Sequence, residues 1–409
     1  MRHGSVVLSG KASADLRRHN RAVVLELVRT RGPISRAELA RVGRLSMPAV
    51  MDIIGGLVEE GLVQEVGVGP SSGGRRPMLL QLVPQAYCAI GLEVGAHTLT
   101  AVVTDLNAAV QRRLEVPSTM AQGPEALATQ LRGTLHDVFA QQIAGFGGVL
   151  GIGLALPAPV LSSTALSFSP PSYPGWGQIQ LRELVAAEFQ VPVLVDNDAK
   201  AAALGELLFG AGRGARSMFY VMVDRGVGGA AIVGGDLYRG ADGGAGEIGH
   251  MLIELEGPLC GCGKHGCLEA FVGRAAIVRR AVRAINLAGR SELGGQPQAK
   301  LKTEHVIEAG IAGDAVAQGV LQETGRYLGI GIANVVNLFN PELVVLGGST
   351  MRAGSLILDP VTNVVSQRVL PGMAERLRIG VGALGQDASA IGAAALVLRQ
   401  LFVEGSLLT

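Results

Sequence analysis

Three of the four cysteines fall within eight residues, at Cys260, Cys262 and Cys267, and His250 lies ten positions before the first of them. Thiolate and imidazole are the ligands that tetrahedral zinc prefers, and four protein ligands are typical of a structural site. Disulfides are the alternative, but three clustered thiols cannot all pair among themselves, and Cys88 is distant in sequence. The motif therefore predicts a structural Zn²⁺ site in a chain that occupies a reducing compartment.

A second group of polar residues follows an apolar run at 193–195. Asn197 and Asp198 come at the end of this predicted strand, directly before a predicted helix. In that position Asp198 could take a proton from a sugar hydroxyl, while Asn197 hydrogen-bonds a neighbouring hydroxyl. The alternative is structural, because an Asp in this position is also a frequent helix N-cap.

The elements that would position these residues form an internal repeat. Residues 86–116 run as an apolar strand, a glycine turn, a second apolar strand and a polar turn, and residues 218–240 repeat the scheme. A third glycine loop, at 347–349, also follows a predicted strand. Two copies about 130 residues apart indicate a duplicated α/β lobe with a cleft between the halves. Glycine loops of this kind can surround nucleotide phosphates with backbone N–H groups, although glycine turns between strands are common.

The first 82 residues have a different character. They carry 12 Arg or Lys and 7 Asp or Glu, whereas the remainder carries 23 and 27. Helical patterns at 20–30, 35–43 and 46–60, followed by strands at 62–66 and 78–82, predict a winged helix-turn-helix. Ser35 and Ser46 are the expected N-caps and Gly43 the expected turn residue.

A helix-turn-helix places its third helix in the major groove of DNA. Arg41 is a further possible phosphate ligand, and the start of the third helix offers no Arg, Lys, Asn or Gln, so phosphate contacts should dominate. The alternative is a small helical protein-interaction domain. The residues expected to contact DNA are Arg36, Arg44, Ser46, Met47, Arg75 and Arg76.

Nearly the whole chain resembles the ROK family, which groups sugar-responsive repressors with sugar kinases. The resemblance is carried by Gly73-Gly-Arg-Arg-Pro77, by Asn197-Asp-Ala199, and by Glu247-Ile-Gly-His250 leading to the cysteine cluster and Glu269. It implies a two-lobed actin-like fold of the duplicated ribonuclease-H type. It also implies that sugar hydroxyls are bound by Asn197, Asp198, Glu247, His250 and Glu269, with His250 serving both zinc and sugar.

The expected organisation has three parts. Residues 1–82 form the winged helix-turn-helix, residues 86–195 form a first ROK lobe completed by a C-terminal helix at about 386–405, and residues 196–385 form a second lobe with the zinc site. No signal peptide or membrane span is expected, since the most apolar window, 143–161, is broken by glycines and prolines. A cytoplasmic protein follows, with symmetric assembly into a homodimer or homotetramer.

Departures from the kinase pattern decide between functions. The kinases of this family resemble one another in a first phosphate loop that begins Asp-x-Gly-Gly-Thr, whereas this chain has Glu93-Val-Gly-Ala-His97. Its second loop opens with Asp224-Arg225. Carboxylates there oppose phosphate binding, on which phosphoryl transfer depends. We expect a sugar-responsive repressor without catalytic residues, Asp198 holding the family's base position.

Two alternatives remain. The first is an ATP-dependent sugar kinase carrying a DNA-binding module. The second is a DNA-binding protein with a vestigial sugar site. It is favoured by Ser169-Pro-Pro171, which stands where the family kinases resemble Ser-Pro-Asn in the region expected to contact the sugar.

Overall fold

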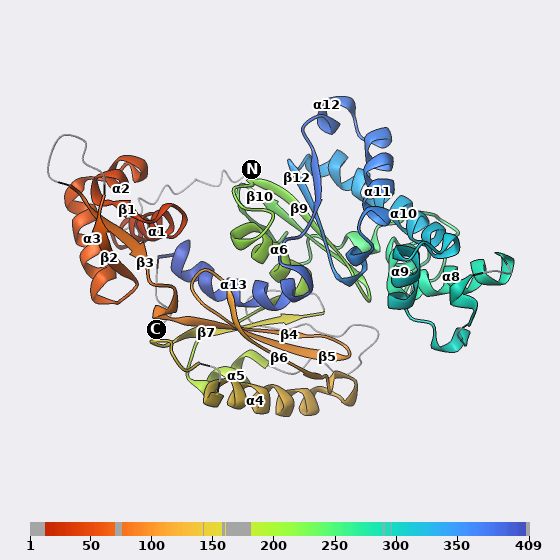
Figure 1. Ribbon diagram of the computed structural model, residues 1–409, viewed down its shortest axis with the longest axis horizontal. Coiled ribbons are helices and arrows are strands. Elements are labelled where there is room, and N and C mark those ends of the chain that lie inside the picture. Colours follow the sequence, from red (N-terminus) through yellow and green to blue (C-terminus); the bar gives the residue numbers. More distant parts are fainter. Residues whose placement is uncertain are drawn as a thin grey trace, which may run out of the picture.

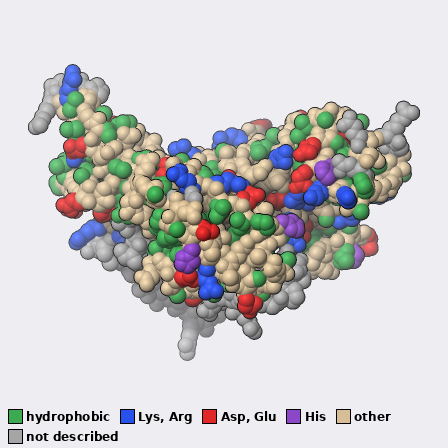
Figure 2. Space-filling model, turned by 60° about the horizontal axis from the view of Figure 1, so that its bottom comes forward, with side chains coloured by type: hydrophobic (Ala, Val, Ile, Leu, Met, Phe, Trp, Pro, Cys, Tyr) green, Lys and Arg blue, Asp and Glu red, His purple; other side chains and the backbone are tan. Residues whose placement is uncertain are grey.

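The computed structural model describes residues 13–69, 76–141, 143–157, 160, 181–288, 291–295 and 297–405, and the statements below concern these residues. A small N-terminal module lies at one end and two larger α/β units make up the rest (Figure 1). In the space-filling view the module projects from the body as an arm (Figure 2). Arg75 and the segment 169–176 lie outside the described residues.

The N-terminal module contains the three expected helices and the wing. Its sheet has the order β1-β3-β2, with β2 and β3 antiparallel, and the two-residue strand β1 was not expected from the sequence. The elements are α1 (Ser13–Arg31), β1 (Ile34–Ser35), α2 (Arg36–Gly43), α3 (Met47–Glu59), β2 (Val63–Val68) and β3 (Met78–Leu82).

The helix starts follow the predicted caps. The Ser35 side chain accepts a hydrogen bond from the Glu38 backbone N–H, and Ser46 accepts one from that of Ala49. The turn between α2 and α3 differs from expectation, because the left-handed conformation is adopted by Arg44, with φ 53°, and not by Gly43. The prediction for Gly43 was therefore wrong.

The first of the two large sheets has the order β6-β5-β4-β7-β8. Strands β4, β5 and β6 pair antiparallel, and β7 and β8 continue the sheet in parallel with β4. Helices α4 and α5 cover one face and α13 the other (Figure 1). The elements are β4 (Cys88–Val94), β5 (Thr98–Thr104), β6 (Val110–Pro117), α4 (Pro124–Gln141), β7 (Val149–Leu156), α5 (Leu181–Phe189), β8 (Val193–Asn197) and α13 (Ala388–Phe402).

The second sheet repeats this scheme, with the order β11-β10-β9-β12-β13. Strands β9 to β11 pair antiparallel, and β12 and β13 run parallel to β9, which confirms the predicted duplication. The strands are β9 (Ser217–Val223), β10 (Val227–Val233), β11 (Asp236–Tyr238), β12 (Leu343–Gly347) and β13 (Arg378–Val381). The helices are α6 (Asp198–Phe209), α7 (Glu269–Val272), α8 (Arg274–Ala288), α9 (Thr303–Ile311), α10 (Ala315–Phe339), α11 (Ser355–Arg368) and α12 (Pro371–Ala374).

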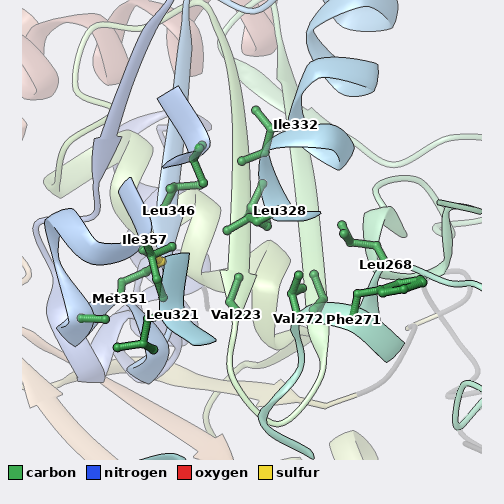
Figure 3. Close-up of a cluster of buried hydrophobic side chains, with 14 of the residues drawn as sticks. Val223, Leu268, Phe271, Val272, Leu321, Leu328, Ile332, Leu346, Met351 and Ile357 are labelled. Carbon is green, nitrogen blue, oxygen red and sulfur yellow. The ribbon is translucent and has the colours of Figure 1, made fainter. Parts of the chain in front are cut away.

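The largest hydrophobic core lies between the second sheet and its helices. Val223 and Leu346 from the sheet face Leu328 and Ile332 of α10, all essentially inaccessible to solvent (Figure 3). Leu268, which directly follows the last clustered cysteine, belongs to the same core. Because burial of such side chains stabilises by about 1.5–3 kcal/mol each, the cysteine segment is anchored to a rigid support.

Helices α6 and α13 pack against each other through small residues. The helix expected at about 386–405 is α13, which also packs on β4 and β7. A Cβ at Gly392 would lie 2.0 Å from the Ala201 carbonyl oxygen, so the two backbones are in direct contact. Buried Glu206 adds polar links, since its carboxylate accepts hydrogen bonds from the backbone N–H groups of Ala211 and Leu384 at 2.7 and 2.9 Å. The residue limits of the three expected parts stay a prediction.

Substitution of Gly392 tests this contact. We expect Gly392→Ala to lower the free energy of unfolding by about 1–3 kcal/mol, since the new methyl overlaps backbone atoms that cannot move independently. Gly319→Ala, on the exposed side of α10 with no atom within 4 Å of the new Cβ, is the control and should be neutral or stabilising. Denaturant unfolding measures both, and equal stability of the two variants would contradict the packing described.

No helix within the described residues is both long enough and apolar enough to cross a membrane.

Candidate metal and ligand site

The four predicted metal ligands lie together. One ligand atom from each of His250, Cys260, Cys262 and Cys267 falls within 4.8 Å of the others. Cys260 Sγ lies 3.8 Å from His250 Nδ1, and Cys262 Sγ lies 3.7 Å from Cys267 Sγ. The cysteines form no disulfide.

The separations suit a metal ion. Two sulfurs bound at about 2.3 Å to a tetrahedral zinc lie roughly 3.8 Å apart, close to the distances found here. The three sulfurs and one imidazole nitrogen therefore fit Zn²⁺ in ligand type, number and spacing. Cys260 and Cys267 are buried, Cys262 is half-buried and His250 is exposed, so the group is open to its surroundings on the histidine side.

Backbone hydrogen bonds fix the shape of the cysteine loop. The Cys260 N–H donates to the Lys264 carbonyl oxygen at 2.8 Å, and the Leu268 N–H donates to that of Met251 at 2.9 Å. Gly266 has φ 73°, and a Cβ there would lie 1.7 Å from the Glu254 carbonyl oxygen. Only glycine fits such a position, so the loop holds Cys267 against the segment that carries His250.

Asn197 and Asp198 stand where β8 ends and α6 begins. The Asn197 side chain caps α6 by accepting a hydrogen bond from the Lys200 N–H at 3.2 Å, and its amide donates to Asp198 Oδ1 at 2.9 Å. The cap is therefore the asparagine and not the aspartate. Burial is the main cause that raises the pKa of Asp198 to about 7; a hydrogen bond from the Ala199 N–H opposes this effect, and the nearby Asp224 and Glu247 add to it.

Glu247 and Glu269 connect these residues to the cysteine cluster. Glu269 Oε2 accepts a hydrogen bond from the Val227 N–H at 3.0 Å, and its Oε1 lies 3.5 Å from Cys260 Sγ. The pKa of Glu247 lies above its ordinary value, because the effect of burial exceeds the opposing effects of Lys200 and His250. The five residues expected to bind sugar thus lie around one region, bounded by α6, the β9–β10 turn and the segment before the cysteines.

Sequence reasoning missed Lys200 and Asp196. Lys200 is 1% exposed, and its ammonium group donates to the Gly243 carbonyl oxygen. Asp196, also 1% exposed, is paired with Arg239 at 2.7 Å and accepts a hydrogen bond from the Asn197 N–H. Both fix segment 239–247 to the start of α6. Their positions beside Asn197 and Asp198 in the sequence could have drawn attention to them, but their burial depends on contacts with distant segments.

Glu93, in β4, belongs to the same acidic region. Burial is the main cause that raises its pKa to about 8, with Asp198, Asp224 and Asp387 adding to the effect and Arg113 opposing it. With this pKa Glu93 is mostly neutral at pH 7, and it is the acids around it, Asp224 among them, that are unfavourable for a bound polyphosphate.

The pKa of Glu93 predicts a loss of stability with rising pH. Its ordinary value is 4.5 and its folded value about 8, so the folded chain holds more protons than the unfolded chain between these limits. The free energy of unfolding therefore falls as pH rises through this window and levels off above it. We expect Glu93→Gln to melt several degrees above the parent chain at about pH 9 and to match it at about pH 5. Glu125→Gln, exposed on α4, is the control, and thermal unfolding that shows the same pH profile for Glu93→Gln and the parent would refute the prediction.

The second and third glycine loops are joined by polar contacts. Ser349 Oγ donates to Asp224 Oδ1 at 2.7 Å, and Arg274 Nη1 lies 3.5 Å from the same oxygen. Arg274 is also paired with Glu304. A nucleotide phosphate entering between these loops would have to break this network and approach the Asp224 charge.

The residues expected to contact DNA are only partly available. Arg36 Nη2 forms an ion pair with Glu65 at 2.8 Å, so its guanidinium is held against the wing. Ser46 is exposed but caps α3. Arg44, Met47 and Arg76 are exposed on the surface of the module.

Comparison with known proteins places the chain. The model of the ROK family matches residues 89–400. The chain belongs to the ROK family. It is 31% identical to a xylose repressor of Bacillus spizizenii over 384 residues, 93% of this chain and 95% of that protein.

Two solved structures show the same fold. A ROK family transcriptional regulator, a homologue of the Escherichia coli MLC protein, superposes with a TM-score of 0.83 at 26% identity and covers 95% of this chain and 98% of its own. A ROK family glucokinase from Streptomyces griseus, in complex with glucose and AMPPNP, superposes with a TM-score of 0.68 at 29% identity. The match covers 76% of this chain and 98% of the glucokinase chain. This ROK chain therefore matches the regulators over nearly its whole length and the kinase over a smaller part. The expected actin-like ROK fold with an N-terminal DNA-binding module is confirmed.

Proposed function

We propose that the protein is a sugar-responsive transcriptional repressor that acts in the cytoplasm. Its winged helix-turn-helix binds operator DNA, and a sugar bound beside the metal site controls that binding. The observation that carries the proposal is that a winged helix-turn-helix and the residues that we expect to bind sugar hydroxyls occur in one chain, 93% of which aligns with 95% of a xylose repressor.

The sugar would be held mainly by carboxylates. Asp198, Glu247 and Glu269 offer acceptors to hydroxyl groups, and Asn197 adds an amide. Hydrogen bonds to charged groups contribute about 1.5–3 kcal/mol each, enough for specific binding of a small polyhydroxyl ligand. Zinc bound by the cysteines and His250 Nδ1 would fix the loop and leave the other ring nitrogen of His250 for the ligand.

A physical connection links the sugar residues to the DNA-binding module. Asp198 is the first residue of α6 and Phe209 the last. The Arg29 guanidinium of α1 lies 5.0 Å from the centre of the Phe209 ring and 5.1 Å from that of Phe402 in α13. The core of the module continues into α13, since Val24 and Leu398 belong to the same buried cluster. Movement of α6 on sugar binding would therefore reach α1.

Regulation then follows from a shift between two conformations. A coupling free energy of about 1–3 kcal/mol changes operator occupancy by one to two orders of magnitude. We expect a homodimer or homotetramer, because paired helix-turn-helix modules read half-sites about one helical turn apart and a small rotation destroys that spacing.

The test is a gel shift with DNA from upstream of the protein's own gene, with and without each of a panel of hexoses and pentoses. A retarded band that one sugar changes supports the proposal, and absence of any DNA binding refutes it. Incubation with ATP, Mg²⁺ and the same sugars tests for a kinase, since formation of sugar phosphate would overturn the regulator-only proposal. Calorimetry with the sugars detects a vestigial site, which would release no heat of binding.

A further inference from the structure

The outer face of α3 is apolar and acidic. Val50, Ile54 and Leu57 of this helix are buried in the module, which leaves the opposite side to solvent. Met47 is 43% exposed and Met51 53% exposed, one helical turn apart. Among the described residues, the exposed side chains and glycine of α3 are Met47, Pro48, Met51, Asp52, Gly55, Val58 and Glu59. None of these side chains can donate a hydrogen bond.

This composition restricts which base edges the helix can recognise. Guanine presents only acceptors in the major groove, and it is read by donors such as Arg or Lys. Thymine presents a C5-methyl group, which apolar side chains contact. Two methionines at i and i+4 therefore suit thymine methyl groups, and Asp52 suits an amino group of cytosine or adenine.

Basic residues around this face indicate that DNA is its partner. Arg41, on α2, has its side chain 75% exposed and lies 3.6 Å from the Glu38 carboxylate, and Arg44 is exposed in the turn, three residues before Met47. Arg76 is exposed two residues before β3 begins. Arginines flanking an apolar helix face match a groove floor between two phosphate backbones.

We propose that Met47 and Met51 read thymine C5-methyl groups in each operator half-site. The inference rests on the proposed function, because it needs the protein to bind DNA. Each methionine side chain would displace water from a thymine methyl group and form an apolar contact with it in the major groove. Operator preference at these positions then comes from an apolar contact and not from a hydrogen bond to a base.

The test replaces thymine by deoxyuridine, which pairs identically and lacks only the methyl group. A duplex site is first selected from a random DNA library with the full-length protein. Each thymine of that site is then replaced in turn, and affinity is measured by fluorescence anisotropy at one salt concentration. We expect one or two positions in each half-site to lose about fourfold in affinity for each methyl group removed.

Variants identify the side chains responsible. Met47→Ala and Met51→Ala should each bind the thymine and deoxyuridine duplexes equally at one of the sensitive positions. Met78→Ala is the matched control, since Met78 is 39% exposed on β3, and it should keep the full discrimination. Circular dichroism melting verifies that the three variants fold alike.

The outcomes separate the inference from the proposed function. If the protein selects and binds a DNA site but deoxyuridine changes nothing at any position, the inference is wrong and the repressor proposal stands. Discrimination that persists when Met47 and Met51 are both replaced by alanine in one chain also refutes the inference. If no DNA is bound at all, the proposed function itself fails.

Discussion

Replacement of Cys267 by serine should leave the purified protein with almost no bound zinc, where we expect the parent chain to carry one ion per molecule. The sulfur lies 3.7 Å from that of Cys262, in a group of four ligand atoms within 4.8 Å of one another. A hydroxyl is a poor zinc ligand at neutral pH, and a structural site with three ligands loses most of its binding free energy. Metal analysis by mass spectrometry measures the stoichiometry.

The loss of zinc should also weaken sugar binding. Glu269 touches Cys260 and also accepts from the Val227 N–H, so release of the cysteine loop frees one of the proposed hydroxyl acceptors. We expect sugar affinity to fall by about 100-fold or more. Even substitution of residues that only support the ligands of a metal site lowers metal affinity or activity by about 10–100-fold, and here a ligand itself is lost. DNA binding without sugar should change little, because the module lies apart from the cluster (Figure 1).

A matched control is available in the fourth cysteine. Cys88 is buried in β4, away from the cluster, and Cys88→Ala should keep one zinc ion and a normal sugar response. The metal assignment would be wrong if the parent chain held no zinc after purification without chelators, or if Cys267→Ser retained it.

Asp198→Ala should abolish the sugar response while operator binding persists. The variant removes a carboxylate that we expect to accept hydrogen bonds from sugar hydroxyls, each contributing about 1.5–3 kcal/mol. Affinity should therefore fall by about 100-fold or more, measured by calorimetry with the sugar found in the gel shift. The fold should be retained, because the cap of α6 is supplied by the Asn197 side chain.

Asp137→Asn, on the exposed surface of α4, is the control for this variant and should respond to sugar normally. An Asp198→Ala protein that still released or retained operator DNA on addition of sugar would show that the ligand binds elsewhere.

The local features of the fold could be predicted because short-range rules determine them. Ser35 and Ser46 cap their helices as expected, and the apolar spacing of α3 predicted the buried side at Val50, Ile54 and Leu57. The repeat of strand, turn and strand anticipated both sheets. The cysteine cluster was predictable for a similar reason, since its ligands lie within 18 residues of one another.

Contacts between distant segments could not be predicted in this way. Nothing near Arg36 in the sequence announces its pairing with Glu65, which removes it from the set of simple phosphate ligands. Burial of Lys200 depends on segment 239–247 folding over it. Even the short turn before α3 differed, because Arg44 adopts the left-handed conformation that a glycine rule assigned to its neighbour.

The glycine and alanine contact between α6 and α13 has a mechanical consequence. Ala201 and Gly392 meet backbone to backbone, with no flexible side chains between them to absorb a displacement. If sugar binding displaces Asp198, as we propose, the two helices would transmit that displacement as one rigid unit to Phe209 and Phe402. A different effector would then need new side chains only around Asp198, while the same helix pair would still connect the site to the module.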